Sequence, residues 1–468
     1  MKLFSFLFLV LFIAGVGFAQ IDLLHTFNGT KGENPNSDLT LSGNILFGMT
    51  PYGGANGLGT IFSLHLDGSG FTDLTDFNGQ NGANPFGALT LYGNVLFGMT
   101  SNGGNWNDGI IFSIQTDGTG FTKVLDFNDT NGLHPEGSLL VSGNILFGMT
   151  RDGCLKGYGS VFSLHTDGTH DTTLFNFNDT TGLHPTGSLI LSGSTLYGMT
   201  VSGGVKNDGV LFSIHTDGTG YSKLLDFNGL NGENPSGSLQ FSGSDFYGMT
   251  SSGGLYGYGR IFSIQSDGAN YVDLLDFNVT NGASPFGSLT LSGNTLYGMT
   301  SNGGPDTTGN IFSINTDGRA YTDLFDFDTS HLNYGLIPNG SLLINGNTIY
   351  GMTQNGGASP MPLGIGDGVI FNLNLPTGIG ELDNPSDDNL KIFPNPASTQ
   401  IHYSGNLNTD DPINVCVLDL TGRVLLSRTE HTFSADNTLD ISGFCKGFYL
   451  LRMISSSGLS FQKPFVVN

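Results

Sequence analysis

The amino-acid sequence predicts an all-β fold in which one four-stranded unit repeats along most of the 468-residue chain. The first observation is a Gly-Met-Thr triplet whose copies begin at Gly48, Gly98, Gly148, Gly198, Gly248, Gly298 and Gly351. The second is that short apolar runs alternate with glycine-containing turns inside each copy. The third is that no window keeps apolar residues at helical spacing. Four strands in about 50 residues are typical of one blade of a β-propeller.

The copy at residues 187–228 shows the elements that we expect in every copy. Its predicted strands are residues 188–191, 196–200, 210–215 and 221–227. Ser192-Gly193-Ser194 separates the first two strands and Asp217-Gly218 the last two, so each pair is expected to form a hairpin. Asp-Gly is a common two-residue hairpin turn, which assigns the recurring Asp-Gly pairs to turns. The methionine of each triplet lies on a strand and is expected to pack between blades.

A displaced strand near the N-terminus predicts how the repeats close. Residues 21–28 match the fourth strand of a copy, although they precede the first Gly-Met-Thr. The seventh copy ends after residues 369–373 without a fourth strand of its own. We therefore expect a seven-bladed β-propeller closed by the N-terminal strand, because closure removes the exposed edges of a linear array. A straight or spiral β-solenoid is the alternative, but it has no use for a displaced strand.

The rest of the chain divides by composition. Residues 1–19 have the pattern of a signal peptide, since Lys2 is followed by an apolar run and by Gly17-Phe18-Ala19 as a cleavage site. The apolar run is too short to favour a transmembrane helix. The expected order after it is a propeller over residues 20–376, a polar linker over 377–389 and a small C-terminal β-sandwich over 390–468.

The repeats are strongly acidic. Between Ile21 and Gly378 there are 29 acidic and 8 basic residues, which accounts for 21 of the 24 net negative charges of the chain. A surface of this sign repels phosphate groups, so we expect no nucleic-acid partner and only weak interaction with anionic membranes. The solubility of a secreted protein explains the charge, and acidic loops that hold Ca²⁺ are the alternative.

The repeat pattern resembles a known family of tandem repeats. Leu-Tyr-Gly-x-Thr, Gly-Gly, Gly-x-x-Phe, Asp-Gly and Gly-x-x-Pro follow one another as in the Gloeo/Verruco-type (GloVer) repeat of exported bacterial proteins, over Ile21 to about Pro376. The layout is also similar to kelch blades, which share the Gly-Gly pair but usually carry a Trp on the fourth strand that is missing here. The GloVer resemblance implies no established activity.

The tail resembles a second family. Phe-Pro-Asn-Pro-Ala at 393–397, Asp419 with Gly422-Arg423, and Gly447 with Tyr449 look like the C-terminal sorting domain of the type IX secretion system. This resemblance implies that the protein engages the secretion machinery and crosses the outer membrane. It also implies that the tail is removed and that the protein is then released or attached at the cell surface.

The three cysteines are too few for a disulfide scaffold. Cys416 and Cys445 lie in the same C-terminal segment and are candidates for a disulfide after export. Cys154 would then be left over. It stands where other copies have the second glycine of the Gly-Gly pair, and we interpret it as a tolerated substitution rather than a reactive thiol.

No residue pattern indicates catalysis or a metal centre. Nothing resembles a nucleophile elbow, a Cys/His pair or a phosphate loop. His65, His165 and His215 occupy the same third-strand position in different copies, so we expect them to point outward and to lie apart rather than bind one ion. The sequence therefore predicts no catalytic residue, metal ligand or cofactor, with Ca²⁺ at the Asp-Gly turns as the alternative.

The loop after Gly-Gly is where the copies differ most. We expect all of these loops to emerge on one face, because equivalent positions of a repeat share one end of the sheets. Trp106, Tyr158, Tyr256 and Tyr258 lie in them, and exposed aromatic side chains beside Asn and Asp suit stacking on sugar rings. Drift without function explains the same variation.

These observations predict a non-enzymatic binding or structural module, exported to the cell surface or secreted. Its expected ligand is a glycan or a protein, bound at the loop face or at the axial opening. The alternative is an enzyme acting on polysaccharide, either a glycosidase or a lyase, which for a glycosidase needs two carboxylates about 5 to 10 Å apart. Paired carboxylates from two blades at the channel mouth would favour the enzyme.

Overall fold

The computed structural model describes residues 21–154, 157–357 and 366–375, and in the tail residues 390–393, 397–405, 413–418, 424–430, 437–444, 446–455 and 460–467. The predicted signal peptide and linker lie outside these residues. The chain forms two compact units, Met1–Pro376 and Thr377–Asn468. Within the described ranges, no helix has the length and hydropathy needed to cross a membrane.

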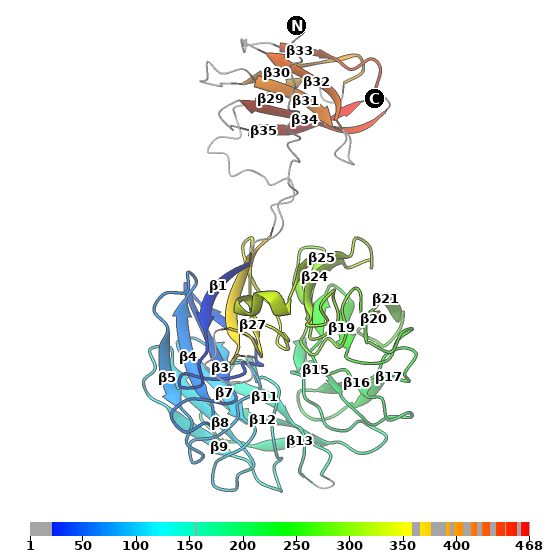
Figure 1. Ribbon diagram of the computed structural model, residues 1–468. Coiled ribbons are helices and arrows are strands. Elements are labelled where there is room, and N and C mark those ends of the chain that lie inside the picture. Colours follow the sequence, from blue (N-terminus) through cyan, green and yellow to red (C-terminus); the bar gives the residue numbers. More distant parts are fainter. Residues whose placement is uncertain are drawn as a thin grey trace. The chain divides into compact units, whose positions relative to one another are not determined.

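Six similar four-stranded antiparallel sheets follow one another along the first unit (Figure 1). The first two contain β2 (Thr40–Ser42), β3 (Ile45–Thr50), β4 (Thr60–His65) and β5 (Thr72–Asp76), and β6 (Thr90–Tyr92), β7 (Val95–Thr100), β8 (Ile110–Gln115) and β9 (Thr122–Asp126). The next two contain β10 (Leu140–Ser142), β11 (Ile145–Thr150), β12 (Ser160–His165) and β13 (Thr172–Asn176), and β14 (Ile190–Ser192), β15 (Thr195–Thr200), β16 (Val210–His215) and β17 (Ser222–Asp226). The last two contain β18 (Gln240–Ser242), β19 (Asp245–Thr250), β20 (Arg260–Gln265) and β21 (Val272–Asp276), and β22 (Thr290–Ser292), β23 (Thr295–Thr300), β24 (Asn310–Asn315) and β25 (Thr322–Asp326).

A seventh sheet combines the two ends of the unit. It contains β26 (Leu343–Asn345), β27 (Thr348–Thr353), β28 (Val369–Asn374) and, at its edge, β1 (Ile21–Thr26). β1 pairs antiparallel with β28, from Ile21 opposite Leu373 to Thr26 opposite Val369, with an irregularity between Leu23 and His25. This is the pairing that the displaced strand predicts, and Figure 1 shows β1 in dark blue beside the yellow strands of the last sheet.

The Gly-Met-Thr triplet has a packing reason at each position. A Cβ at Gly48 would collide with the ring of Phe62 on the neighbouring strand. Met49 is fully buried in a cluster shared by the first and second sheets, which confirms the predicted core position of the methionine. Thr50 Oγ1 donates to the carbonyl oxygen of Tyr52 at 2.9 Å and so holds the turn that follows the strand.

Apolar clusters join each sheet to the next. The cluster containing Phe47 and Phe112 joins the first sheet to the second, and five similar clusters continue along the repeats. A further cluster joins the seventh sheet back to the first, through Phe27, Phe62 and Met352. Every sheet of the described unit therefore shares its buried faces with two neighbours.

The Asp-Gly pairs lie in turns, as predicted. β16 ends at His215 and β17 begins at Ser222, so the connection has six residues where the sequence predicts five. Asp67 Oδ1 accepts the backbone N–H of Ser69 at 2.9 Å and its hydroxyl at 2.6 Å. The side chain therefore closes a local turn inside a longer loop, which the Asp-Gly pair by itself does not reveal.

The seventh copy contains a short 3₁₀ helix, η1 (Thr329–Tyr334), in the connection that leads to β26. The second unit has two sheets. One contains β29 (Leu390–Phe393), β30 (Gln400–Gly405) and β33 (Asn437–Asp440), and the other β31 (Ile413–Leu418), β32 (Val424–Glu430), β34 (Gly447–Ser455) and β35 (Ser460–Val467). Buried residues of both sheets, including Tyr403 and Leu451, form one core.

Candidate functional site

A cavity of about 500 Å³ lies where the seven copies converge. Each copy contributes the residue that lies four positions before the start of its first strand. These residues are Asn36, Phe86, Glu136, Thr186, Ser236, Phe286 and Asn339. The third and fourth copies add Arg151, His184, Val201 and Ser202. A volume in this range suits a small organic ligand.

A narrow neck of about 90 Å³ shares this ring of residues. It is built from the next two residues of each copy, mostly Gly-Ser. A Cβ at Gly87 would collide with the carbonyl oxygen of Gly137, and an equivalent clash recurs from copy to copy. Ala88 N–H donates to Ser138 Oγ at 2.8 Å. The same bond continues through Ser188, Ser238, Ser288 and Ser341 to Asp38. Burial of Asp38 in the neck raises the pKa of its carboxyl. The hydrogen bond from Ser341 lowers this pKa and so opposes part of the effect.

The third and fourth copies carry a charged wall. Arg151 Nη1 donates to Glu136 Oε1 at 2.9 Å. Asp152 lies between two histidines, with Oδ1 at 2.9 Å from His184 Nδ1 and Oδ2 at 3.2 Å from His134 Nδ1. Arg151 and Asp152 directly follow the last residue of β11. The end of this strand therefore positions both the ion pair with Glu136 and the contacts of Asp152 with the two histidines.

Burial raises the pKa of the Glu136 carboxyl, and the ion pair with Arg151 opposes this effect. The nearby charge of Asp152 adds to the rise. Glu136 therefore keeps its proton to a higher pH than an exposed glutamate. A glutamate accepts hydrogen bonds when it is ionised and can also donate one when it is protonated.

The charged wall breaks the internal symmetry of the repeat. Where the third and fourth copies have His134 and His184, other copies have Asn34, Asn84, Asn234, Ser284 and Ile337. All of these positions have a left-handed backbone, with φ of 51° at His134 and 54° at His184. Asparagine tolerates this conformation better than most residues. The scaffold therefore does not require histidine here, which suggests that these side chains serve the cavity.

An aromatic wall lies in other copies. Phe86 lines the cavity and contacts Tyr52 edge to face, with ring centroids 6.4 Å apart. Phe286 lines it from the sixth copy and is 42% exposed. An exposed phenylalanine in the cavity lining offers a flat apolar face to a ligand.

The aromatic residues that the sequence singles out lie outside the cavity lining. Trp106 is 66% exposed on the loop between β7 and β8, and Tyr256 and Tyr258 are exposed between β19 and β20. Their role as ligand-binding residues stays a prediction. Tyr158 is the exception among the four, because its ring centroid lies 6.4 Å from that of His184. Its carbonyl oxygen also accepts the His184 N–H at 3.1 Å.

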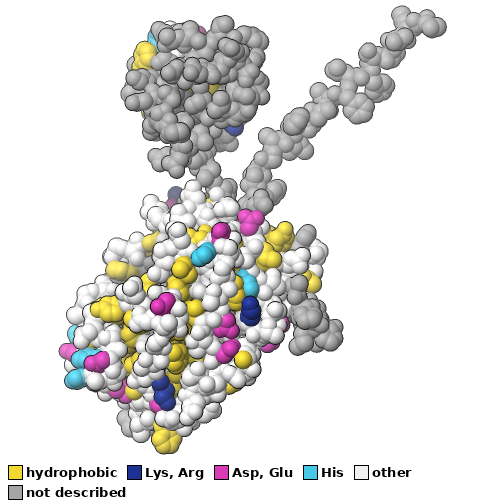
Figure 2. All heavy atoms as spheres, turned by 90° about the vertical axis from the view of Figure 1, so that its left-hand side faces the viewer, with side chains coloured by type: hydrophobic (Ala, Val, Ile, Leu, Met, Phe, Trp, Pro, Cys, Tyr) yellow, Lys and Arg dark blue, Asp and Glu magenta, His cyan; other side chains and the backbone are white. Residues whose placement is uncertain are grey.

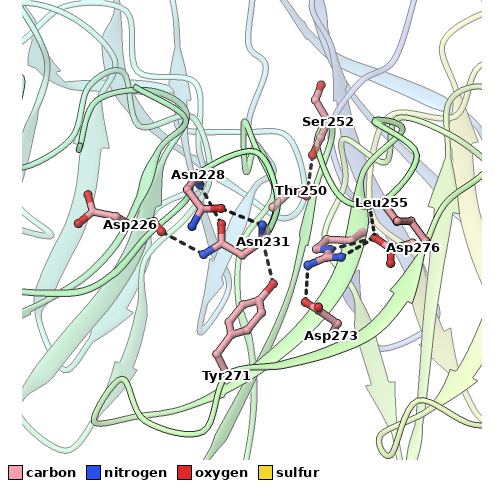
Figure 3. Close-up of polar contacts among 10 residues, drawn as sticks. Asp226, Asn228, Asn231, Thr250, Ser252, Leu255, Tyr271, Asp273 and Asp276 are labelled. Carbon is pink, nitrogen blue, oxygen red and sulfur yellow. Dashed lines mark hydrogen bonds and ion pairs between the residues drawn. The ribbon is translucent and has the colours of Figure 1, made fainter. Parts of the chain in front are cut away.

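The same hydrogen bond, from a backbone N–H of the loop to an aspartate at the end of the fourth strand, anchors these variable loops in four copies. The N–H of Leu255 donates to Asp276 Oδ1 at 2.9 Å, at the end of the fourth strand of that sheet. Asp276 also forms an ion pair with the buried Arg260, whose guanidinium contacts Asp273 as well (Figure 3). Ala55, Asn105 and Val205 make the same backbone bond in their own copies. The side chains of the loops are thus free to vary while their first residue is fixed.

The remaining candidates are a metal site and the disulfide of the C-terminal segment. The described residues contain no group of three or more His, Cys, Asp or Glu side chains placed to hold a metal ion. Cys416 Sγ lies 3.3 Å from Ser427 Oγ. Cys445 lies outside the described residues, so its pairing with Cys416 stays a prediction. On the side of the first unit shown in Figure 2, acidic groups are more frequent than basic ones and several hydrophobic side chains are exposed.

Sequence reasoning missed Glu136, Arg151, Asp152 and the two histidines beside them. The signal was present: when the copies are aligned, these positions are charged or imidazole-bearing in the third or fourth copy and mostly uncharged in the others. The search instead favoured aromatic residues in the most variable loops. Those loops share an end with the cavity but are not part of its lining.

These features define a tandem-repeat β protein with a separate C-terminal β domain. Family models for the Gloeobacter/Verrucomicrobia repeat match residues 12–157 and 134–371, and the chain belongs to this family. The secretion system C-terminal sorting domain matches residues 391–468. The protein is therefore secreted or located at the outer cell surface, and it interacts with the type IX secretion machinery through this domain.

A comparison with curated proteins finds no match. Similar solved structures include the extracellular domain of a hybrid two-component system from B. thetaiotaomicron, with 12% identity and a TM-score of 0.48 over 96% of this chain and 58% of that one. This chain thus spans less than two thirds of that protein. A europium-containing methanol dehydrogenase has 9% identity and a TM-score of 0.45 over 76% of this chain and 93% of the enzyme. Neither likeness carries an argument about function.

Proposed function

We propose that residues 21–375 form a seven-bladed β-propeller whose last blade is completed by β1. Three observations support this closure. β1 pairs with β28, an apolar cluster joins the seventh sheet to the first, and the Ser341 N–H donates to Asp38 across the same seam. A closed ring protects the backbone edges that an open array would expose.

Within this ring, the protein acts as an exported, non-enzymatic binding module that holds a sugar in the central cavity. The observation that carries this proposal is the division of the cavity wall. Phe86 and Phe286 offer aromatic faces, while Glu136, Arg151 and His184 offer charged or imidazole hydrogen-bonding groups. Sugar rings present the same two surfaces, apolar C–H faces and hydroxyl edges.

A glycan array probed with the full mature chain tests the proposal. Phe286→Ala should weaken binding about fivefold, since the loss of one aromatic contact costs on the order of 1 kcal/mol. Trp106→Ala is the matched control and should bind like the wild type. The reverse pattern would move the ligand to the loop face, and binding to no glycan would exclude a sugar ligand.

An enzyme acting on polysaccharide is the second candidate, and the raised pKa of Glu136 is the observation that favours it. A protonated carboxyl in a cavity is suited to general acid catalysis, with Asp152 as the nearby carboxylate. Both groups come from the third copy, whereas the sequence argument asked for carboxylates from two blades. Release of reducing ends from a polysaccharide panel, abolished by Glu136→Gln, would establish this alternative.

A further inference from the structure

We propose that the central cavity recognises the terminal residue of a neutral glycan rather than the middle of a chain or an acidic sugar. This inference rests on the sugar-binding function proposed above and specifies its ligand. It is carried by the shape of the cavity and by the balance of charge in its wall.

The shape permits entry from one side. The main cavity has a volume of about 500 Å³, whereas the neck has a volume of only about 90 Å³. The neck can therefore hold a few water molecules but no sugar ring. The neck cannot widen easily, because the backbone at Gly87 is packed against the carbonyl oxygen of Gly137 and this contact recurs around the ring. A linear polymer therefore cannot thread through the centre. A sugar that fills the cavity must be the end of its chain or a free monosaccharide.

The charge of the wall favours a neutral ligand. Arg151 is the single Lys or Arg among the described residues of the lining, and it forms an ion pair with Glu136. Asp152 adds a negative charge behind His184. The wall therefore has no surplus positive charge to offset a uronate or another acidic sugar. The repeats also carry 21 net negative charges, so an anionic ligand would be repelled as it approaches.

The same ion pair suits neutral hydroxyl groups. The Arg151 side chain is 46% exposed and the Glu136 side chain 22% exposed, so both remain accessible to a ligand. A carboxylate accepts from one sugar hydroxyl while a guanidinium donates to its neighbour, which matches a pair of adjacent hydroxyls. Thr186 and Ser202 also line the cavity and offer further hydroxyl partners.

The test compares matched glycans on the full mature chain. An array of neutral and uronate-containing oligosaccharides first identifies the glycans that bind. Isothermal titration then measures the affinity for three ligands: each glycan that binds, its terminal monosaccharide alone, and the same glycan with one additional sugar attached at that end. We expect neutral binders only, inhibition by the terminal monosaccharide, and at least a tenfold loss of affinity on capping. Glu136→Gln should lose binding at least tenfold, whereas Glu233→Gln, outside the cavity, should retain it.

Each other outcome has a defined meaning. Binding of end-capped chains at full affinity would overturn recognition of the terminus while leaving sugar binding intact. Binding restricted to uronate-containing glycans would overturn the neutral ligand, again without removing the proposed function. Binding to no glycan would remove both proposals. A melting temperature measured for each variant separates loss of a contact from loss of folding.

Discussion

At the scale of single residues, the repeat provides its own controls, because each side chain has equivalents in other copies. Cys154 illustrates this. Its backbone has φ of 61°, in the left-handed region that the equivalent Gly104 and Gly204 occupy without a side chain. The third copy has Ser160 where the first has Thr60, and the smaller side chain leaves space for the thiol. Cys154 therefore fits sterically but retains backbone strain.

Cys154→Gly should stabilise the protein by about 0.5 to 1 kcal/mol. Removing left-handed strain gains about 1 to 2 kcal/mol, and the greater freedom of glycine in the unfolded chain offsets part of it. Urea denaturation of the two proteins measures the difference. Gly104→Cys is the converse control and should be destabilising. A lower unfolding free energy for Cys154→Gly would contradict the strain argument.

Asp326 shows the effect of one missing donor. In other copies a loop N–H donates to the equivalent aspartate, as from Ala55 to Asp76 at 2.8 Å. Pro305 occupies the donor position in the sixth copy and has no N–H. Asp326 Oδ1 has no hydrogen-bond partner within the described part of the chain. Burial and the adjacent Asp323 raise the pKa of Asp326 to about 6.

Pro305→Ala should lower the pKa of Asp326 toward its ordinary value, because it restores the N–H donor. A carboxyl whose pKa is higher in the folded state destabilises the protein as pH rises from about 4 to 6. After allowance for solvent screening, we expect this loss to be about 1 kcal/mol in the wild type and smaller in the variant. NMR titration of the Asp326 carboxyl carbon provides the measurement. An unchanged titration would show that the missing N–H is not the cause.

At the scale of elements, β1 is held by contacts that depend on pH. The His25 ring stacks on Phe71 of the first sheet, with centroids 3.7 Å apart. Its Nε2 is buried without a hydrogen-bond partner among the described residues. Burial lowers the pKa of His25 to about 4, and the positive charge of Lys31 contributes. The neutral ring is therefore the form that fits between the seventh and first sheets.

Acid should weaken this seam. The pKa of His25 is lower in the folded state than its usual value near 6.5, so the stability it permits is lost as pH falls from about 6.5 to 4. His25→Leu, which introduces the residue found at Leu225 in the fourth copy, should reduce the loss by about 1 to 2 kcal/mol after screening is considered. Thermal unfolding at pH 7 and pH 4.5 measures the change. Equal acid sensitivity in both proteins would exclude His25 as the cause.

The elements of the repeat could be predicted from the sequence because each strand is a short apolar run bounded by glycine. The third strand was predicted at residues 210–215, and β16 spans Val210–His215. The pairing of β1 followed from the position of residues 21–28 before the first copy. The side-chain hydrogen bond inside the Asp-Gly turn, from the Ser69 N–H to Asp67, could not be predicted from the strand pattern. The axial opening was one of the two expected ligand positions, but the residues that line it were not predicted, because Glu136 and Arg151 lie in connections without periodicity.

At the scale of the whole molecule, the shared sheet makes β1 a structural requirement for the first unit. Deleting residues 21–28 would remove Ile21 and Phe27 from two apolar clusters and leave β28 with an unpaired edge. Unpaired edges recruit strands from other molecules.

We expect the protein without residues 21–28 to melt at least about 10 °C lower and to form dimers or larger species. Light scattering coupled to gel filtration, together with thermal unfolding, measures both effects. A variant that keeps β1 but carries Leu23→Ser, at a 41% exposed position, is the matched control and should behave like the wild type. A monomeric deletion variant with an unchanged melting temperature would exclude a closing role for β1.

The distance between β1 and its partner along the chain has a consequence for biosynthesis. Ile21 is synthesised before its partner Leu373, which comes 352 positions later along the chain, just before the sorting domain. A chain that terminates before β28 lacks both this partner strand and the C-terminal sorting domain. A chain that carries the sorting domain has therefore already synthesised β28, the strand that pairs with β1, so chains without this strand also lack the domain that the secretion machinery recognises.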